Sequence, residues 1–155
     1  MLVISHRGNT LGVDPSIENK PEVILDCINK GICVEIDLRL FNDKPYLGHD
    51  EAQYEITLNF LLENKDWFWV HCKEKKSFDY ALRHNLHCFW HDVDDYTMTS
   101  WGYVWAYPGK DSVGTLCIGV MPEKHWAPGQ VIIDNEFFGV CTDIPIAFLD
   151  IINSK

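Results

Sequence analysis

One short run constrains the fold of this chain more than any other, and it reads Gly31-Ile32-Cys33-Val34-Glu35-Ile36-Asp37-Leu38. The run alternates as a strand does, so Cys33, Glu35 and Asp37 share one face and the apolar residues share the other. Two carboxylates on one face of a buried strand repel each other and lose hydration, which is unfavourable unless positive charge lies between them. The groups available for this elsewhere in the chain are His6, Arg7, His49, His71 and Lys73.

Size and charge exclude several classes of partner. The 155 residues suit one domain, so we expect a single domain over residues 1–155. The formal net charge of −10 argues against nucleic acid and anionic membranes as partners. No apolar run is long enough to span a bilayer, so stable membrane insertion is not expected. An anionic substrate would need a metal ion or a local basic pocket.

The first residues and the cysteines favour a cytoplasmic location. Residues 1–5 lack the basic start, long apolar stretch and cleavage site of a signal peptide, and they are typical of a first strand. None of the six cysteines forms a CxxC pair, and most lie within apolar, strand-like runs. This pattern predicts reduced cysteines in the core of a cytoplasmic protein.

The first fifty residues predict a strand–helix–strand unit. Leu2-Val3-Ile4 is a short apolar strand, and a helix is expected from about Pro21 to Lys30, with Gly31 ending it. The strand over residues 32–38 follows, and this order with a crossover of this length is a βαβ unit. At the end of the first strand stand a histidine, an arginine and a glycine. The glycine permits a turn there, so that the two basic side chains can point into one shared pocket.

Several motifs resemble one known family. Ser5-His6-Arg7-Gly8, Glu18-Asn19, Glu35-Ile36-Asp37 and Gly48-His49-Asp50 are similar in order and spacing to the signature of the glycerophosphodiester phosphodiesterases. The segment Gly139-Val140-Cys141-Thr142-Asp143-Ile144-Pro145 resembles the last-strand motif of that family. The match covers roughly the first third of the chain and this second piece near its end.

The resemblance implies a barrel. The family fold is the TIM-type (β/α)₈ barrel of typically about 250 residues, so this chain would be a shortened form. Eight strands are expected, with helices missing or reduced in the second half, where residues 130–133 are read as a strand. Residues 108–114 are too few for a normal parallel connection. The uncovered outer face would be rich in Trp and Tyr, which favours a homo-oligomer.

The resemblance also implies roles for single residues. His6 and His49 would be the acid and base pair, because the pKa of imidazole lies near working pH. Arg7 and Lys73 would hold the phosphate oxygens of a small-molecule phosphodiester. Glu35 and Asp37 suit Mg²⁺ or Ca²⁺. The alternative for that pair is a structural role, bonded only to Arg7 and Lys73. Glu18 would orient Arg7, and Asn19 would contact phosphate or metal. The alternative for both residues is simple hydrogen bonding within the loop and at the helix cap.

One departure from the family pattern concerns the third metal ligand. The family has Glu-x-Lys in the next strand, and this chain has His71-Cys72-Lys73. Three readings of His71 remain open: a ligand beside the two carboxylates, which would shift the preference toward Mn²⁺ or Zn²⁺; a bystander of a two-carboxylate site; or a cation that replaces the metal. Further site candidates are His91-Asp92 and Trp105, and the remaining histidines at 84, 87 and 125 are expected to face solvent.

Three functions remain open at this point. The leading hypothesis is a metal-dependent hydrolase that cleaves a phosphodiester carrying a polyol or sugar alcohol. The second is a lyase-like route in which a neighbouring hydroxyl of the substrate attacks and gives a cyclic phosphate. The third is a non-catalytic binding module on a degenerate barrel, suggested by the missing glutamate at position 71 and the lost helices.

Overall fold

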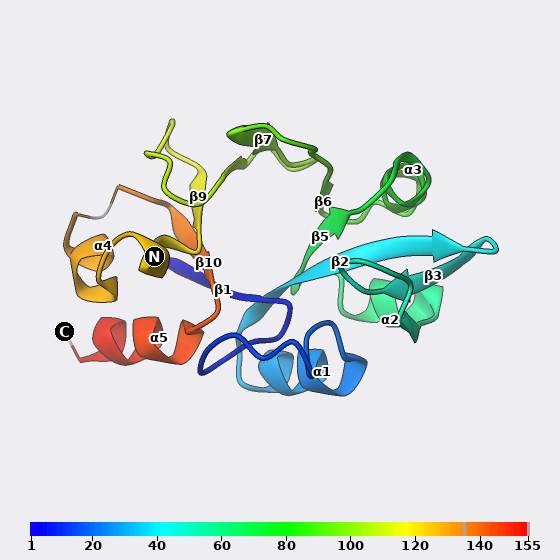
Figure 1. Cartoon of the computed structure of the whole chain (residues 1–155), viewed down its shortest axis with the longest axis horizontal. Helices are drawn as coiled ribbons and strands as arrows, with labels where there is room; N and C mark the ends of the chain where they lie inside the picture. The colour runs from blue at the N-terminus through cyan, green and yellow to red at the C-terminus, as the bar shows by residue number, and fades with distance from the viewer. Residues whose placement is uncertain (135, 155) are drawn as a thin grey trace.

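Ten strands form one mixed sheet that curls into a half-barrel in the structure, a computed structural model that describes residues 1–134 and 136–154 (Figure 1). The strands are β1 (Leu2–His6), β2 (Cys33–Phe41), β3 (Lys44–Leu47), β4 (Tyr54–Glu55), β5 (Phe68–Cys72), β6 (Cys88–Phe89), β7 (Tyr96–Met98), β8 (Val104–Ala106), β9 (Cys117–Val120) and β10 (Gly139–Thr142). The helices are α1 (Pro21–Asn29), α2 (Leu58–Glu63), α3 (Lys75–Arg83), the 3₁₀ turn η1 (Pro122–Lys124), α4 (Pro128–Asp134) and α5 (Pro145–Asn153).

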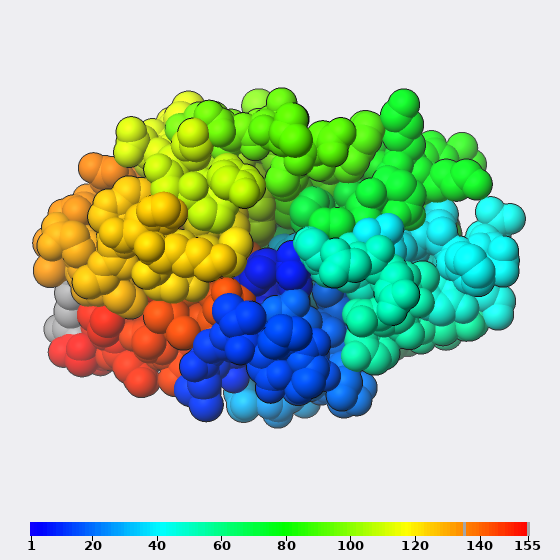
Figure 2. All heavy atoms as spheres, viewed as in Figure 1, coloured from blue at the N-terminus to red at the C-terminus, as the bar shows by residue number. Residues whose placement is uncertain are grey.

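A parallel series of strands is the centre of this sheet. It runs in the order β6, β5, β2, β1, β10, β9 and β8, and each neighbouring pair is parallel. The strand β1 therefore lies between the carboxylate-bearing β2 and the last strand β10, with His6 opposite Glu35 and Ser5 opposite Thr142. In Figure 2 the blue N-terminal residues lie between the orange-red C-terminal part and the cyan-green part.

The prediction of a shortened (β/α)₈ barrel is wrong, because the sheet does not close over the part of the chain that the structure describes. Within the described residues no ladder joins β6 to β8, and β7 instead pairs antiparallel with β8 at the edge of the sheet. No α-helix lies between α3 and η1 in that part of the chain. A parallel crossover usually contains a helix, whereas residues 90–103, between β6 and β8, form the antiparallel strand β7 and loops. The sheet therefore stays open on this side.

A second correction concerns residues 130–133, which were expected to form a strand. They lie in α4 (Pro128–Asp134), which begins at a proline and directs Val131 and Ile132 into the core. The run of β-branched residues suggested a strand because such side chains favour sheets. The parallel neighbours β9 and β10 require a crossover between them, and α4 provides it.

The core divides between the two faces of the curled sheet. The first three helices cover β2 and β5, with Ile24 and Leu61 fully buried, while α4 and α5 cover the β1–β10–β9 side around Phe148. The concave side is filled by a separate cluster of large side chains: Ile4, Trp69, Phe89, Trp105, Ile118, Val120 and Cys141. This aromatic layer forms the floor beneath the carboxyl ends of the parallel strands, which is where sites lie in open α/β sheets.

The cysteines and helices bear on two further expectations. All six cysteines are unpaired thiols, and five of them are buried, as the strand-like runs predicted. None of the helices in the described part of the chain combines the length and the apolar character that a bilayer crossing requires.

Candidate functional site

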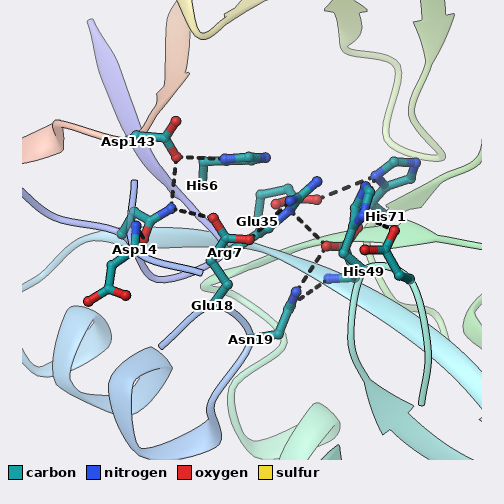
Figure 3. A network of polar contacts seen from close by, with 12 residues as sticks. His6, Arg7, Asp14, Glu18, Asn19, Glu35, His49, His71 and Asp143 are labelled. Carbon is teal, nitrogen blue, oxygen red and sulfur yellow. Dashed lines mark hydrogen bonds and ion pairs between the residues drawn. The ribbon is translucent and has the colours of Figure 1, made fainter. Parts of the chain in front are cut away.

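A pocket of about 380 Å³ opens at the carboxyl ends of the parallel strands. Six of the residues singled out from the sequence line it: His6, Arg7, Glu35, His49, His71 and Lys73. They come from the ends of β1 and β5, from the part of β2 that lies between these strands, and from the loop after β3. Figure 3 shows five of them, His6, Arg7, Glu35, His49 and His71, from these separate segments. Parallel strands bring such ends to one edge, so the strand order explains the convergence.

The two carboxylates of β2 lie beneath this pocket and are almost fully buried. Glu35 is 2 % exposed and Asp37 is 0 % exposed. Because β2 and β5 are parallel neighbours with Asp37 opposite His71, the imidazole lies against both acids. Its Nδ1 is 3.5 Å from Glu35 Oε1 and 3.3 Å from Asp37 Oδ1. One ligand atom from each of these three residues lies within 4.8 Å of the others, close enough to share a metal ion.

Positive and hydrogen-bonding groups surround Asp37. Arg7 Nε and Asn19 Nδ2 each lie 2.9 Å from Oδ2, and Lys73 Nζ lies 3.3 Å from Oδ1. Burial disfavours the charged form of Asp37, but His71 and the cations Arg7 and Lys73 outweigh it and hold the pKa of this carboxyl well below its usual range. Asp37 is therefore an anion at neutral pH.

Two oxygens of the pair retain capacity for a ligand. Glu35 Oε2 is buried and has no hydrogen-bond partner among the described residues, and Asp37 Oδ1 has only its ion-pair contacts with His71 and Lys73. Buried acceptors of this kind are uncommon unless an ion or water binds to them. The donor set of two carboxylates and one imidazole, together with the unpaired Glu35 Oε2, fits a divalent cation.

The ring of His71 is held in place by aromatic stacking. Phe89 of the neighbouring strand β6 and His91, two residues beyond it, lie against the ring, with ring centroids 4.8 Å and 4.9 Å away and interplanar angles of 13° and 7°. Burial lowers the pKa of His71, but the contacts with Asp37 and Glu35 raise it by more than burial lowers it. The pKa of His71 is therefore above the usual histidine value. The contacts with the two carboxylates thus favour the protonated form of His71.

His6 forms a buried pair with a residue whose role the sequence did not suggest. Its Nδ1 is 2.7 Å from Asp143 Oδ1, at the end of β10, and Asn9 Nδ2 donates to the same oxygen at 2.9 Å. Burial lowers the pKa of His6, and the hydrogen bond to Asp143 raises it above the usual value overall. Asp143 lies in the segment that resembles the last-strand motif, so the motif was the available signal, although it gave no role.

The loop after β1 orients the arginine of the pocket. Arg7 NH1 contacts Glu18 Oε2 at 3.1 Å, and the other Glu18 oxygen accepts from Asn9 at 3.0 Å. Asn19 is 1 % exposed and bonds Asp37 twice, through its amide nitrogen and by accepting from the backbone N–H, both at 2.9 Å. Both loop residues thus bond to neighbouring protein groups. Glu18 contacts Arg7, which agrees with the expectation that Glu18 orients this arginine.

His49 lies at the rim of the pocket on the loop after β3. Its side chain is 40 % exposed, and its Nδ1 lies 2.8 Å from Asp50 Oδ1. The preceding Gly48 has a φ of +152°, and a Cβ at this position would meet the Glu51 carbonyl oxygen at 2.1 Å. Only glycine allows this turn, which brings His49 to the same pocket as His6.

The remaining candidates divide between the pocket and the core. His91 and Trp105 line the pocket, and His91 Nδ1 is buried without a hydrogen-bond partner among the described residues. His87 was expected to face solvent and is instead buried, 3 % exposed, because it stacks on Trp101 and packs beside Trp69. Its Nε2 lies 2.8 Å from Thr99 Oγ1. No feature of the local sequence distinguished it from an exposed histidine.

Comparisons with protein-family models, with curated proteins and with solved structures found no match to this chain.

Proposed function

We propose that this protein is a metal-dependent phosphodiesterase that resembles the glycerophosphodiester phosphodiesterases and hydrolyses a small-molecule phosphodiester carrying a polyol or sugar alcohol. The observation that carries the proposal is the composition of one pocket. Two histidines, His6 and His49, line the same cavity as Arg7, Lys73 and Glu35, whose Oε2 has no hydrogen-bond partner among the described residues. Phosphoryl transfer requires these three elements together: proton donors and acceptors, anion-binding groups, and a site for a divalent cation.

Arg7 and Lys73 would bind the diester. Both line the pocket, and each is held by an ion pair with Asp37, so their positions are fixed before a substrate arrives. Glu18 fixes the guanidinium of Arg7 from the other side. A planar guanidinium can bind two phosphate oxygens at once, whereas the ammonium acts as a point charge. Local positive charge of this kind offsets the net charge of −10 for an anionic substrate.

His6 and His49 would exchange the protons. Asp143 occupies Nδ1 of His6, so Nε2 is the ring nitrogen left for the substrate. A carboxylate in this position orients the imidazole and stabilises its protonated form. One histidine would take the proton of the attacking water and the other would give a proton to the leaving alkoxide.

Glu35, Asp37 and His71 would hold the divalent cation. A bound cation would lower the pKa of a water or hydroxyl and neutralise charge that develops on the phosphoryl oxygens. Mg²⁺ or Ca²⁺ suits the two carboxylates, and the imidazole adds a preference for Mn²⁺ or Zn²⁺. Binding as a ligand requires neutral His71, so metal binding would release a proton from this residue.

Calorimetry with Mg²⁺, Ca²⁺, Mn²⁺ and Zn²⁺ on the native protein and on Asp37→Asn tests the cation site. We expect binding to the native protein and none to the variant. A phosphodiester panel with the same metals tests the activity, and phosphorus NMR of the product separates hydrolysis from formation of a cyclic phosphate. A folded protein that cleaves no diester with any of these metals contradicts the proposal.

A binding module without catalysis is the second candidate. It is favoured by the fact that Arg7, Lys73 and His71 already neutralise the two carboxylates without a metal ion. In that case phosphate or a diester would bind to the native protein in calorimetry, no metal would bind, and no product would form.

Two broader statements belong to the same proposal. The six unpaired thiols favour a reducing compartment such as the cytoplasm. The edge strand β7 and the turn after it expose Met98 and Trp101 by 69 % and 51 %, and we propose that this edge supports a homo-oligomer. Light scattering of the purified protein measures its oligomeric state directly.

A further inference from the structure

Arg39 lies beside the proposed site, and none of the motifs in the sequence analysis assigned it a role. It stands on β2 two residues beyond Asp37, so the alternation of the strand places both side chains on the same face. At this point β2 leaves the parallel series and pairs antiparallel with β3, with Arg39 opposite Tyr46. The Arg39 side chain is 23 % exposed, so the guanidinium is largely enclosed by its partners.

The guanidinium binds two consecutive backbone carbonyls of the loop that carries His49. Its Nε donates to the Gly48 carbonyl oxygen at 3.0 Å, and NH2 donates to the carbonyl oxygen of His49 itself. The Gly48 N–H donates to the Asp37 carbonyl oxygen at 3.0 Å. The backbone at His49 is thereby tied to β2 on both sides, directly next to the carboxylate pair.

The same guanidinium also reaches the segment that follows Lys73. Its NH1 lies 3.4 Å from Glu74 Oε2, and the other oxygen of Glu74 accepts from the Leu40 N–H at 2.7 Å. Glu74 caps the start of α3, where its side chain and Ser77 form a reciprocal capping box. Arg39 therefore joins the loop of His49 to the chain directly after Lys73.

Little else holds His49 in position. Its ring contacts Asp50, whose side chain is 92 % exposed, and no other side chain in the described residues donates to the carbonyls of Gly48 and His49. The segment from Asp50 to Gln53 buries no residue that would anchor it by packing. Besides the backbone bonds of Gly48 to Asp37 and of Gln53 to Leu47, the contacts made by Arg39 are thus the ones that hold the backbone at His49.

We propose that Arg39 is a positioning residue that fixes His49, and through Glu74 the segment after Lys73, relative to Asp37. The catalytic part of this inference rests on the proposed phosphodiesterase function, and the structural part does not. A lysine at position 39 keeps the positive charge but presents one ammonium in place of a planar fork. It cannot bind both carbonyls and Glu74 in the observed geometry.

The experiment combines amide exchange with kinetics on Arg39→Lys and Arg39→Gln. Exchange of the Gly48 amide reports the attachment of the loop to β2, and we expect it to accelerate about tenfold or more in both variants. Kinetics with bis(4-nitrophenyl) phosphate and Mn²⁺ report the position of His49. We expect kcat to fall about tenfold to a hundredfold, with KM changed less than about threefold, because Arg7 and Lys73 still bind the diester.

Arg83→Gln is the matched control. Arg83 is 74 % exposed on α3 and pairs with Asp79 at 2.8 Å, so the substitution removes the same charge from a side chain that does not bind the loop carbonyls. We expect native exchange at Gly48 and native kinetics in this variant. Glu74→Gln provides an independent variant in case Arg39→Gln does not fold, and it should accelerate exchange at Gly48 to a smaller extent.

The two arms fail separately. Native exchange at Gly48 in both Arg39 variants overturns the positioning role, whatever the kinetics show. Native kcat in Arg39→Lys with accelerated exchange overturns the link between the loop and the reaction. If the native protein cleaves no diester, the proposed function fails, and the exchange arm still decides whether Arg39 fixes the loop of His49.

Discussion

At the scale of the residue, the site depends on charges that are buried in contact with one another. Asp37 and Glu35 are nearly inaccessible to solvent, and each is compensated by side chains from other strands or loops. An isolated charge in such a place would cost several kcal/mol, so removal of one partner should have a larger effect than a surface substitution. The pair of His6 and Asp143 follows the same rule.

Asp143→Asn tests the role of Asp143 in holding His6. The carboxylate raises the pKa of His6, so its loss should lower that pKa and leave the ring free to rotate. We expect kcat on the phosphodiester that the native protein cleaves to fall by about tenfold or more. Proton NMR titration of His6 measures the pKa change, and Asp150→Asn on α5, which is exposed, is the control for the loss of one carboxylate. An unchanged His6 pKa would contradict the assignment.

His87 predicts how stability depends on pH. Burial lowers its pKa to about 4, whereas the unfolded chain has the ordinary value near 6.5. The unfolded state therefore binds a proton as the pH falls below 6.5 and the folded state does not, so stability is present above pH 6.5 and is lost between 6.5 and 4. The expected loss from pH 7 to pH 5 is about 2 kcal/mol.

Urea unfolding of the native protein and of His87→Phe at pH 7 and pH 5 measures this effect. The phenyl ring keeps the stack on Trp101 and cannot be protonated, so the variant should lose less stability than the native protein over this interval. The same substitution at the exposed His125 should leave the pH dependence as it is. If His87→Phe and the native protein lost equal unfolding free energy between pH 7 and pH 5, His87 would not be the cause of the pH dependence.

At the scale of the element, the sequence predicted most strands and helices because their apolar periods and end residues are local signals. The helix at Pro21 begins at the expected residue, and the carboxylates of β2 lie on one face as the alternation required. The helix α4 was missed because Val131, Ile132 and Ile133 favour a strand by local preference. Its helical form follows from the crossover between β9 and β10, which no local pattern reveals.

Gly48→Ala tests the turn that carries His49. The φ of +152° is unfavourable for alanine, and its Cβ would lie 2.1 Å from the Glu51 carbonyl oxygen. Gly12→Ala is the matched control, because Gly12 has a φ of +139° with no atom within 4 Å of a Cβ. We expect Gly48→Ala to lower the free energy of unfolding by about 2 kcal/mol more than Gly12→Ala, measured by denaturant titration. Equal losses would mean that backbone conformation alone sets the cost.

At the scale of the whole molecule, the sequence was right about which strand ends bear charge and wrong about how the sheet closes. His6, Arg7 and Lys73 follow directly from strands that the apolar pattern identified. The pairing of Asp143 with His6 depends on β10 lying beside β1, a contact between the two ends of the chain. Closure of a barrel likewise depends on long-range pairing of β6 and β8, for which short strands give little local evidence.

Metal binding should stabilise the whole fold, because the three candidate ligands join β2 to β5 in the centre of the sheet. A cation that binds only the folded state at a concentration of 100 Kd adds about 2.7 kcal/mol. For a chain of 155 residues this corresponds to a rise in Tm of about 5–10 °C. Calorimetric scans with and without Mn²⁺, on the native protein and on Glu35→Gln, measure the effect. Glu123→Gln, which changes a carboxylate outside the three ligands, should retain the full rise. A rise of equal size in Glu35→Gln would place the ion elsewhere, and no rise in the native protein would favour His71 as the cation that neutralises the two carboxylates.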